Sequence, residues 1–293
     1  MKRGYGLLYG LIGLMVTFWS GNFIVGKLAL RNFPPLLLVG LRAALAGAFI
    51  LPVYWWEGRR EAHRWKREDV PGLILMGLFG VALNQFFFVM GLSRTSVAHS
   101  AIISGLGPML VLLTASLAGL ERLTARKAIG MTVALAGVAV LKSFEGKSSG
   151  ATWTGDVLTF LGGATFAIFT VAGKRAAARH TSVTVNTFAY CTSGLALAPV
   201  TLWQAWDFPF AGVAAMGWVA LAYMALFPSV VCYLIYYYAL RKIAASRLSA
   251  FSYLQPLLAT TMGVALLGEH IGATLVVGGT VIFSGVYLAE RGR

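Results

Sequence analysis

Ten apolar segments, separated by short polar stretches, are the feature of this chain that most restricts its fold. They cover residues 5–27, 34–56, 70–91, 97–119, 126–143, 154–173, 182–205, 212–239, 247–267 and 272–289. An α-helix needs about 20 mostly apolar residues to cross a bilayer. Ten such helices use most of the 293 residues and leave no length for a soluble domain. The pattern therefore predicts an all-α polytopic membrane protein with ten transmembrane helices.

The composition supports this class and excludes several others. Hydrophobic residues make up 58% of the chain and charged residues 12%, whereas an ordinary soluble domain has about 25% charged residues. A net charge of +14 can indicate nucleic-acid binding, but these Lys and Arg residues form short clusters between apolar segments rather than one basic face. We therefore expect a lipid bilayer and a small-molecule substrate as partners, and no nucleic acid.

The positions of the 24 Lys and Arg residues predict the orientation in the membrane. The loops on the side of the N-terminus hold 18 of them and the loops on the other side hold 5, with Arg42 inside an apolar segment. Basic loops are retained in the cytoplasm. We therefore expect a multi-pass protein of the cell inner (cytoplasmic) membrane, with both termini cytoplasmic.

The second half of the chain repeats residues of the first half in the same order. A shift of 148 positions aligns five distinctive pairs, namely Ser104 with Ser252, Pro108 with Pro256, Glu121 with Glu269, Gly130 with Gly278 and Gly137 with Gly285. Apolar composition alone does not readily produce such a collinear set. The glycine spacing also predicts close helix packing, either within the chain or in a homodimer.

The repeat predicts the domain organisation. Residues 1–145 would form one five-helix unit, residues 146–153 a linker, and residues 154–293 a second five-helix unit. Because five is an odd number, the second unit would cross the membrane upside down. Inverted repeats are typical of carriers that work by alternating access and bind substrate near the midplane, where the repeats meet.

The stretch from Trp19 to Lys27 and the paired residues Pro108/Pro256, Glu121/Glu269, Gly130/Gly278 and Gly137/Gly285 resemble the EamA-type unit of the drug/metabolite transporter superfamily. The start of the unit is matched by the stretch WSGNFIVGK from Trp19 to Lys27 and by Gly40-Leu41-Arg42. Its end is matched in the first half by Pro108, LERL at 120–123, Gly130 and Gly137, and in the second half by Pro256, LGE at 267–269, Gly278 and Gly285. The resemblance implies a ten-helix inner-membrane transporter, in this family often an exporter of amino acids or related metabolites.

Polar and aromatic residues inside the apolar segments are the candidates for substrate binding, because a polar group in a span must be paired or must face a wet cavity. The predicted binding residues are Trp19, Asn22, Arg42, Asn84, Gln85, Phe88, Ser104, Tyr233, Ser252 and Gln255. The alternative for this set is a structural role in interhelical hydrogen bonds and aromatic packing. For Arg42 the choice lies between donation to backbone carbonyls and a clamp on an anionic substrate group.

Two further pairs of residues carry expectations about helix geometry. Pro108 and Pro256 lie mid-span, where a proline frees a carbonyl and bends the helix, so we expect either a hinge of the transport cycle or a static kink. Glu121 and Glu269 each precede a helix, and we expect them to cap it. His99 begins a segment and fits either a wet interface or a proton relay.

The leading functional hypothesis is a secondary transporter that exports small metabolites, amino acids above all, by alternating access. A multidrug or organic-cation efflux carrier is the alternative, although it would be expected to place a carboxylate in the cavity. An intramembrane enzyme is less favoured, because no HExxH or DxxxD pattern lies in or beside a span. We expect no catalytic site, no metal and no cofactor. No carboxylate stands in the middle of a segment, which argues against an intramembrane acid relay.

Overall fold

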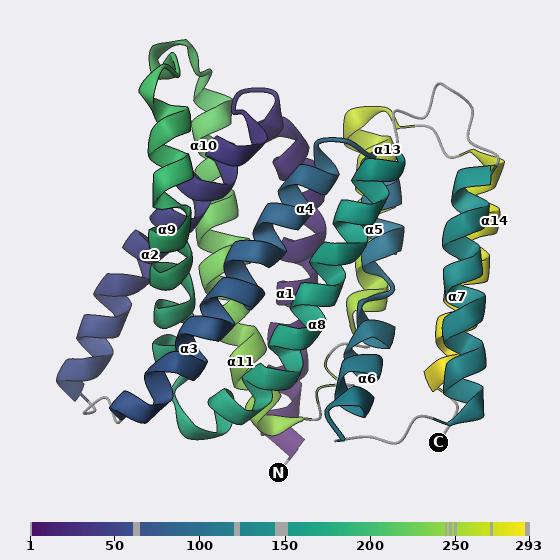
Figure 1. Ribbon diagram of the computed structural model, residues 1–293, viewed down its shortest axis with the longest axis horizontal. Helices are drawn as coiled ribbons and strands as arrows, with labels where there is room; N and C mark the ends of the chain where they lie inside the picture. Colours follow the sequence, from purple (N-terminus) through teal and green to yellow (C-terminus); the bar gives the residue numbers. More distant parts are fainter. Residues whose placement is uncertain are drawn as a thin grey trace.

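The computed structural model describes residues 2–60, 65–119, 124–143, 152–243, 245, 248, 251–269 and 272–290. All regular elements in these ranges are helical (Figure 1). The first half contains α1 (Lys2–Leu30), α2 (Pro35–Arg60), η1 (Arg67–Asp69), α3 (Val70–Gly77), η2 (Leu78–Leu83), α4 (Asn84–Leu92), α5 (Val97–Ser104), α6 (Gly107–Leu117) and α7 (Ala125–Ser143). The second half contains α8 (Trp153–Arg179), α9 (Ser182–Trp206), η3 (Phe210–Gly212), α10 (Ala215–Met224), η4 (Ala225–Val231), α11 (Cys232–Lys242), η5 (Phe251–Tyr253), α13 (Leu254–Leu267) and α14 (Ala273–Glu290).

Several of these helices are long and apolar enough to cross a membrane. In the described ranges six segments meet that criterion, namely Gly6–Leu30, Pro35–Arg59, Arg67–Leu92, Val97–Leu117, Trp153–Lys174 and Ala215–Lys242. Two shorter apolar helices follow at Phe251–Leu267 and Leu275–Gly285. The all-helical architecture agrees with a polytopic membrane protein, while the count of ten spans stays a prediction.

Two of the long helices change their hydrogen-bonding pattern halfway, at corresponding places in the two halves. A π-helical turn, η2, joins α3 to α4, and a second one, η4, joins α10 to α11. A shift of 148 residues places η2 almost on η4. Such turns are uncommon and occur often at functional sites. Here they precede Asn84 and Tyr233, two of the predicted binding residues.

The predicted kinks at the mid-span prolines take a different form in the structure. The chain leaves the helix at Gly105 and Leu106, between α5 and α6, and Pro108 lies in the first turn of α6. In the second half the 3-10 turn η5 precedes α13, and Pro256 is the third residue of α13. A proline is well tolerated in a first helical turn, where its missing N–H has no acceptor. The segments are therefore interrupted just before each proline rather than bent at it.

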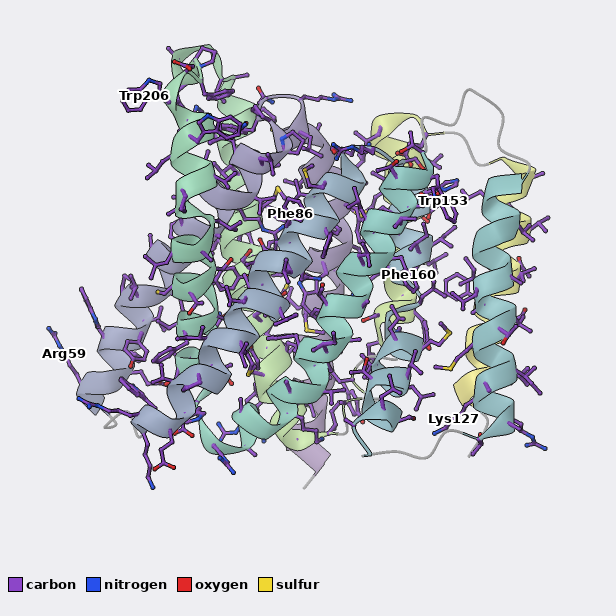
Figure 2. The ribbon with its side chains drawn as sticks, in the orientation of Figure 1. Arg59, Phe86, Lys127, Trp153, Phe160 and Trp206 are labelled. Carbon is purple, nitrogen blue, oxygen red and sulfur yellow. The ribbon has the colours of Figure 1, made fainter. Side chains whose placement is uncertain are left out.

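The helices of the two halves pack against each other in matching pairs. The helix α2 packs along α9, and α7 packs along α14. In the same way α4, α5 and α6 contact α8, whereas α10, α11 and α13 contact α1. Figure 1 shows that α1 begins at the lower end of the bundle, and Figure 2 places Trp153, the first residue of α8, near the upper end. The first helices of the two halves therefore begin at opposite ends.

The glycines of the repeat allow the close approach of α7 and α14. A Cβ atom at Gly137 would lie 2.7 Å from the backbone nitrogen of Ile282 and 3.0 Å from the carbonyl of Gly278. A Cβ atom at Gly285 would lie 2.6 Å from the carbonyl of Gly130. The glycine spacing thus allows α7 and α14 to pack closely within one chain. A homodimer remains a prediction.

Two expectations fall on residues that are not described. Glu121 lies in 120–123, and most of the predicted linker, 146–151, lies outside the described residues as well. The expectation for Glu269 was wrong in its partner: its carboxylate accepts hydrogen bonds from the backbone N–H groups of Val97 (2.8 Å) and Ala98 (3.1 Å). It therefore caps α5 of the other half rather than the helix that follows it.

Candidate substrate site

A cavity of about 130 Å³ lies between the two halves, and all ten predicted binding residues line it. They come from seven helices, since α1, α2, α4, α5, α11, η5 and α13 each contribute at least one. The other lining residues are Phe23, Gly107, Val111, Thr159, Gly162, Gly163 and Phe166. Pro108 and Pro256 are not among the residues that line it, although Gly107 and Gln255 beside them are.

Among the described residues of the lining, Arg42 is the one charged side chain, and it is 3% exposed. Its Nε donates to the hydroxyl of Ser229 at 3.0 Å, while its Nη1 has no hydrogen-bond partner among the described residues. No ion pair holds this guanidinium in the described part of the chain. A buried cation with an unused donor is costly unless an anion joins it. The arrangement therefore suits an anionic group of a substrate.

The π-helical turn η4 provides the partner that orients Arg42. Ser229 lies inside this turn and donates its hydroxyl to the carbonyl of Met224, five residues earlier, at 2.8 Å. The hydroxyl is then left with lone pairs for Arg42 Nε. The same turn leaves the carbonyl of Pro228 to accept a hydrogen bond from Trp19 Nε1 at 3.1 Å. One irregular turn thus positions two lining side chains from α1 and α2.

Four amide side chains line the cavity, and three of them have described hydrogen bonds or unpaired acceptors. Gln85 Nε2 donates to the hydroxyl of Tyr190 at 2.8 Å, and Asn84 Nδ2 donates to the carbonyl of Gly162 at 2.9 Å. The Oε1 of Gln85 and the Oδ1 of Asn22 are buried without a partner among the described residues. The Asn84 hydrogen bond joins α4 to α8, while Asn22 and Gln85 each keep an acceptor that a substrate ammonium or hydroxyl could use.

An aromatic wall covers the side of the cavity next to these polar groups. The ring of Trp19 packs edge-to-face on Phe166 and on Tyr233, with centroids 5.8 and 5.9 Å apart. Tyr236 and Phe169 continue the cluster behind them. Such a wall favours the apolar body of a ligand, because aromatic faces exclude water and bury large areas.

The sequence analysis missed seven lining residues and Ser229, and three of these side chains show why. A shift of 147 positions, which aligns Gly26-Lys27 with Gly173-Lys174, places Phe166 on Trp19, and this correspondence was a usable signal. Nothing in the sequence distinguishes Thr159 from other threonines in helices. Ser229 contacts Arg42 because it lies in a π-helical turn, and no sequence pattern predicts that turn. For metals, none of the described residues form a group of three or more His, Cys, Asp or Glu side chains that could hold an ion.

The sequence family follows from a comparison of each half with known families. The model of the EamA-like transporter family matches residues 5–143 and matches again at 153–290. The chain belongs to the EamA-like transporter family. The resemblance derived from the repeat motifs is confirmed, and this EamA-like protein is a membrane transporter.

Relatives of this EamA-like chain are also named transporters. An uncharacterized transporter of Archaeoglobus fulgidus is 27% identical, over 96% of this chain and 98% of its own. The uncharacterized inner membrane transporter YedA of Escherichia coli K12 is 26% identical, over 98% and 91%. The S-adenosylmethionine/S-adenosylhomocysteine transporter of Chlamydia trachomatis is 24% identical, over 88% and 81%. A solved crystal structure that is 20% identical matches with a TM-score of 0.67 over 98% of this chain and 97% of that one, which supports the fold alone.

Proposed function

We propose that this transporter is a secondary carrier that exports small amphipathic metabolites, with amino acids as the leading class, across the cytoplasmic membrane. The observation that carries the proposal is the cavity of Arg42, where a buried guanidinium with an unused donor faces a substrate space bounded by an aromatic wall. A substrate with a carboxylate, an ammonium group and an apolar body satisfies Arg42, the free amide oxygens and the rings together.

The arrangement of the halves supports alternating access as the mechanism. The cavity lies where helices of both halves meet, and the interruptions at Gly105–Leu106 and η5 lie beside it. Irregular backbone inside a membrane bundle is tolerated where it lines a cavity. Two inverted repeats with broken helices at their interface allow one half to rock against the other around a fixed substrate.

The competing hypothesis of organic-cation efflux has less support. No acidic residue belongs to the described cavity lining, so a permanent cation would lack a counter-ion there. The Chlamydia relative is named for S-adenosylmethionine and S-adenosylhomocysteine, and both molecules carry an α-amino acid group. That chemistry is compatible with the proposed clamp by Arg42.

Counterflow in proteoliposomes tests the proposed function. Vesicles loaded with an unlabelled L-amino acid should take up the same labelled amino acid faster than protein-free vesicles do. A panel covering acidic, basic, polar and apolar side chains should show preference for apolar ones, because of the aromatic wall. The proposal fails if no member of the panel exchanges while the protein remains folded.

The predicted topology gives a separate test. In a variant that lacks Cys191 and Cys232, a single cysteine at Asp207 should react with an impermeant maleimide on intact cells. A single cysteine at the exposed Arg179, at the other end of the bundle, should react only after permeabilisation. The reverse labelling pattern would place both termini outside.

The prolines beside the cavity give a prediction about movement. We expect Pro108→Ala and Pro256→Ala to slow counterflow about tenfold while leaving the amount of inserted protein similar, because alanine allows the interrupted helices to continue through the break. Pro52→Ala in α2, away from the cavity lining, is the control variant. Parent rates in both variants would show that the interruptions are scaffold.

A further inference from the structure

A basic groove of about 610 Å³ lies at the end of the bundle where α1 ends, separate from the substrate cavity. Its lining contains three cations, Lys27, Arg31 and Arg94, and one acidic residue, Glu269. The sequence assigns only five Lys and Arg residues to this side of the membrane, so three of the five gather in one groove. A groove with this excess of positive charge attracts anions.

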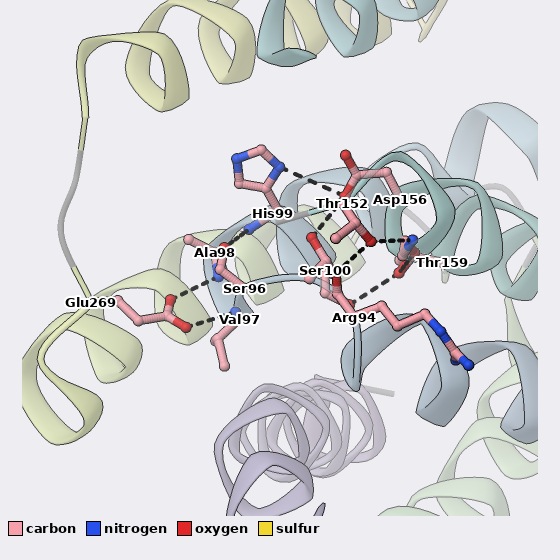
Figure 3. Close-up of polar contacts among 12 residues, drawn as sticks. Arg94, Ser96, Val97, Ala98, His99, Ser100, Thr152, Asp156, Thr159 and Glu269 are labelled. Carbon is pink, nitrogen blue, oxygen red and sulfur yellow. Dashed lines mark hydrogen bonds and ion pairs between the residues drawn. The ribbon is translucent and has the colours of Figure 1, made fainter. Parts of the chain in front are cut away.

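Two of the cations are available to a ligand. Lys27 is half-buried and Arg31 is exposed, and neither side chain makes a hydrogen bond or an ion pair with another described residue. Glu269 attracts Lys27, but its carboxylate accepts hydrogen bonds from the backbone N–H groups of Val97 and Ala98 instead (Figure 3). The groove therefore keeps two cationic groups that an anion can approach and bind by charge-assisted hydrogen bonds.

The third cation, Arg94, follows α4 and is exposed. Its Nη1 donates to the carbonyl of Met90 at 3.0 Å, while Nε and Nη2 have no hydrogen bond in the described part of the chain. Its side chain extends away from the backbone carbonyl that accepts from the hydroxyl of Thr152 (Figure 3). Part of this guanidinium thus also remains for a ligand.

The lysine that corresponds to Lys27 in the second half has a partner. A shift of 147 positions places Lys27 on Lys174, whose Nζ donates to the carbonyl of Ile243, at the end of α11, at 3.1 Å. That contact satisfies a carbonyl at a helix C-terminus. Lys27 makes no equivalent contact with any residue that the structure describes, so its ammonium group is not used to complete a helix.

The groove continues from the cavity along the same helices. Phe23 of α1 lines the cavity, and Lys27, four residues later, lines the groove, which is a distance of about 6 Å along the helix. On α4 the cavity lining includes Phe88, and the groove lining includes Ser93 just after the helix. The helix α2 also contributes to both linings. The groove is therefore next to the cavity on the side toward which α1 and α4 run.

An apolar cluster separates the cavity from the groove. Its buried members include Phe23 and Leu92, and Phe88 packs edge-to-face on Phe23 with centroids 5.2 Å apart. Leu30 and Leu267, which line the groove, pack against the same cluster. A substrate that leaves the cavity at this end must pass this Phe23 cluster, and it then meets the three cations.

We propose that the basic groove is a second anion-binding site, which receives the carboxylate of an exported substrate after it leaves Arg42. The inference rests on the proposed carrier function and on the predicted topology, in which this end faces outward. A carboxylate that leaves a guanidinium for an apolar barrier loses its counter-charge, and the cations beyond the barrier replace it. Arg31 and Arg94 are exposed, so salt screens the attraction. The substrate is therefore held weakly and leaves to outer water.

A cysteine at Ser93 reports the charge of the groove. The full-length variant without native cysteines is reconstituted in phosphatidylcholine nanodiscs, where both ends are accessible. Ser93→Cys should react faster with the anionic 2-sulfonatoethyl methanethiosulfonate than with the cationic 2-trimethylammonioethyl reagent, relative to free cysteine. At low ionic strength, Lys27→Gln and Arg31→Gln should each lower this ratio about threefold. The control Arg179→Gln removes an exposed cation at the other end of the bundle and should leave the ratio unchanged.

Protection of the same cysteine identifies the ligand. L-methionine and N-acetyl-L-methionine share a free carboxylate, and both should slow modification of Ser93→Cys by an uncharged maleimide. L-methionine methyl ester, which lacks the carboxylate, should not slow it. Lys27→Gln should reduce the protection by the two acids. Arg42→Lys should leave it in place, because Arg42 belongs to the cavity and not to the groove.

Several results would overturn the inference. One is a reagent ratio that stays at the parent value in both Lys27→Gln and Arg31→Gln, and another is equal protection by acid and ester. Protection that disappears in Arg42→Lys also overturns it, because the cysteine would then report binding in the cavity. Protection that requires phosphatidylglycerol in the nanodiscs overturns it as well, since the groove would then hold a lipid phosphate. A protein that shows carboxylate protection but no counterflow contradicts the proposed function and still supports an anion site in the groove.

Discussion

Arg42→Lys is expected to weaken binding of a free amino acid about tenfold or more, while binding of the corresponding methyl ester changes little. The guanidinium keeps one donor on Ser229 and offers the others in a planar fork that matches a carboxylate. An ammonium group is a compact point charge and cannot hold both contacts. The measurement is half-saturation of counterflow by each ligand, in parent and variant, at equal amounts of reconstituted protein.

Two outcomes separate a substrate clamp from a scaffold. Loss of the preference for the free carboxylate supports the clamp, whereas an equal loss for acid and ester, or a loss of folded protein, assigns Arg42 to the scaffold. Ser229→Ala is the matched variant, because it removes the acceptor of Arg42 Nε and keeps the charge. It should weaken binding of the acid less than Arg42→Lys does.

The composition of the cavity lining could be predicted from the sequence because the bilayer leaves few choices. Asn22, Asn84, Gln85 and Arg42 stand in apolar segments, and such groups must face one another or a wet cavity. The repeat then directed attention to Tyr233 and Ser252 at the corresponding positions. These residues line one cavity, as expected for polar groups inside a membrane bundle. Their roles in substrate binding remain proposals.

The parts that escaped prediction depend on contacts between the halves. Asp156 stands in the first turn of α8, where a carboxylate normally meets water, yet it is 3% exposed and accepts a hydrogen bond from the hydroxyl of Thr95. Glu269 was expected to cap its own helix, yet α5 passes close enough to present two N–H groups. Ser229 acts through a π turn, a backbone feature without a residue signature.

Gly285→Val is expected to destabilise the protein by about 3 kcal/mol, at the upper end of the usual cost of overpacking. The added Cβ would meet the carbonyl of Gly130 and the backbone of Ala134 on α7, at 2.6 Å from the former and 2.9 Å from the Cα of the latter. These are backbone atoms and cannot rotate away, so α14 must shift away from α7. Thermal unfolding in detergent, followed by tryptophan fluorescence, measures the effect.

The control for this substitution is Gly10→Val in α1, where a Cβ would meet nothing within 4 Å. Both changes replace a helical glycine with valine, so they share the effect on helix propensity and differ in the space around the new side chain. If the glycines pack within the chain, Gly285→Val should lower the unfolding temperature of the monomer and Gly10→Val should not. The opposite outcome is that Gly285→Val dissociates a dimer while the monomer unfolds at the same temperature as the parent monomer. That result would show that the α7 and α14 glycines pack between two copies of the chain, because loss of a contact within one chain would lower the stability of the monomer.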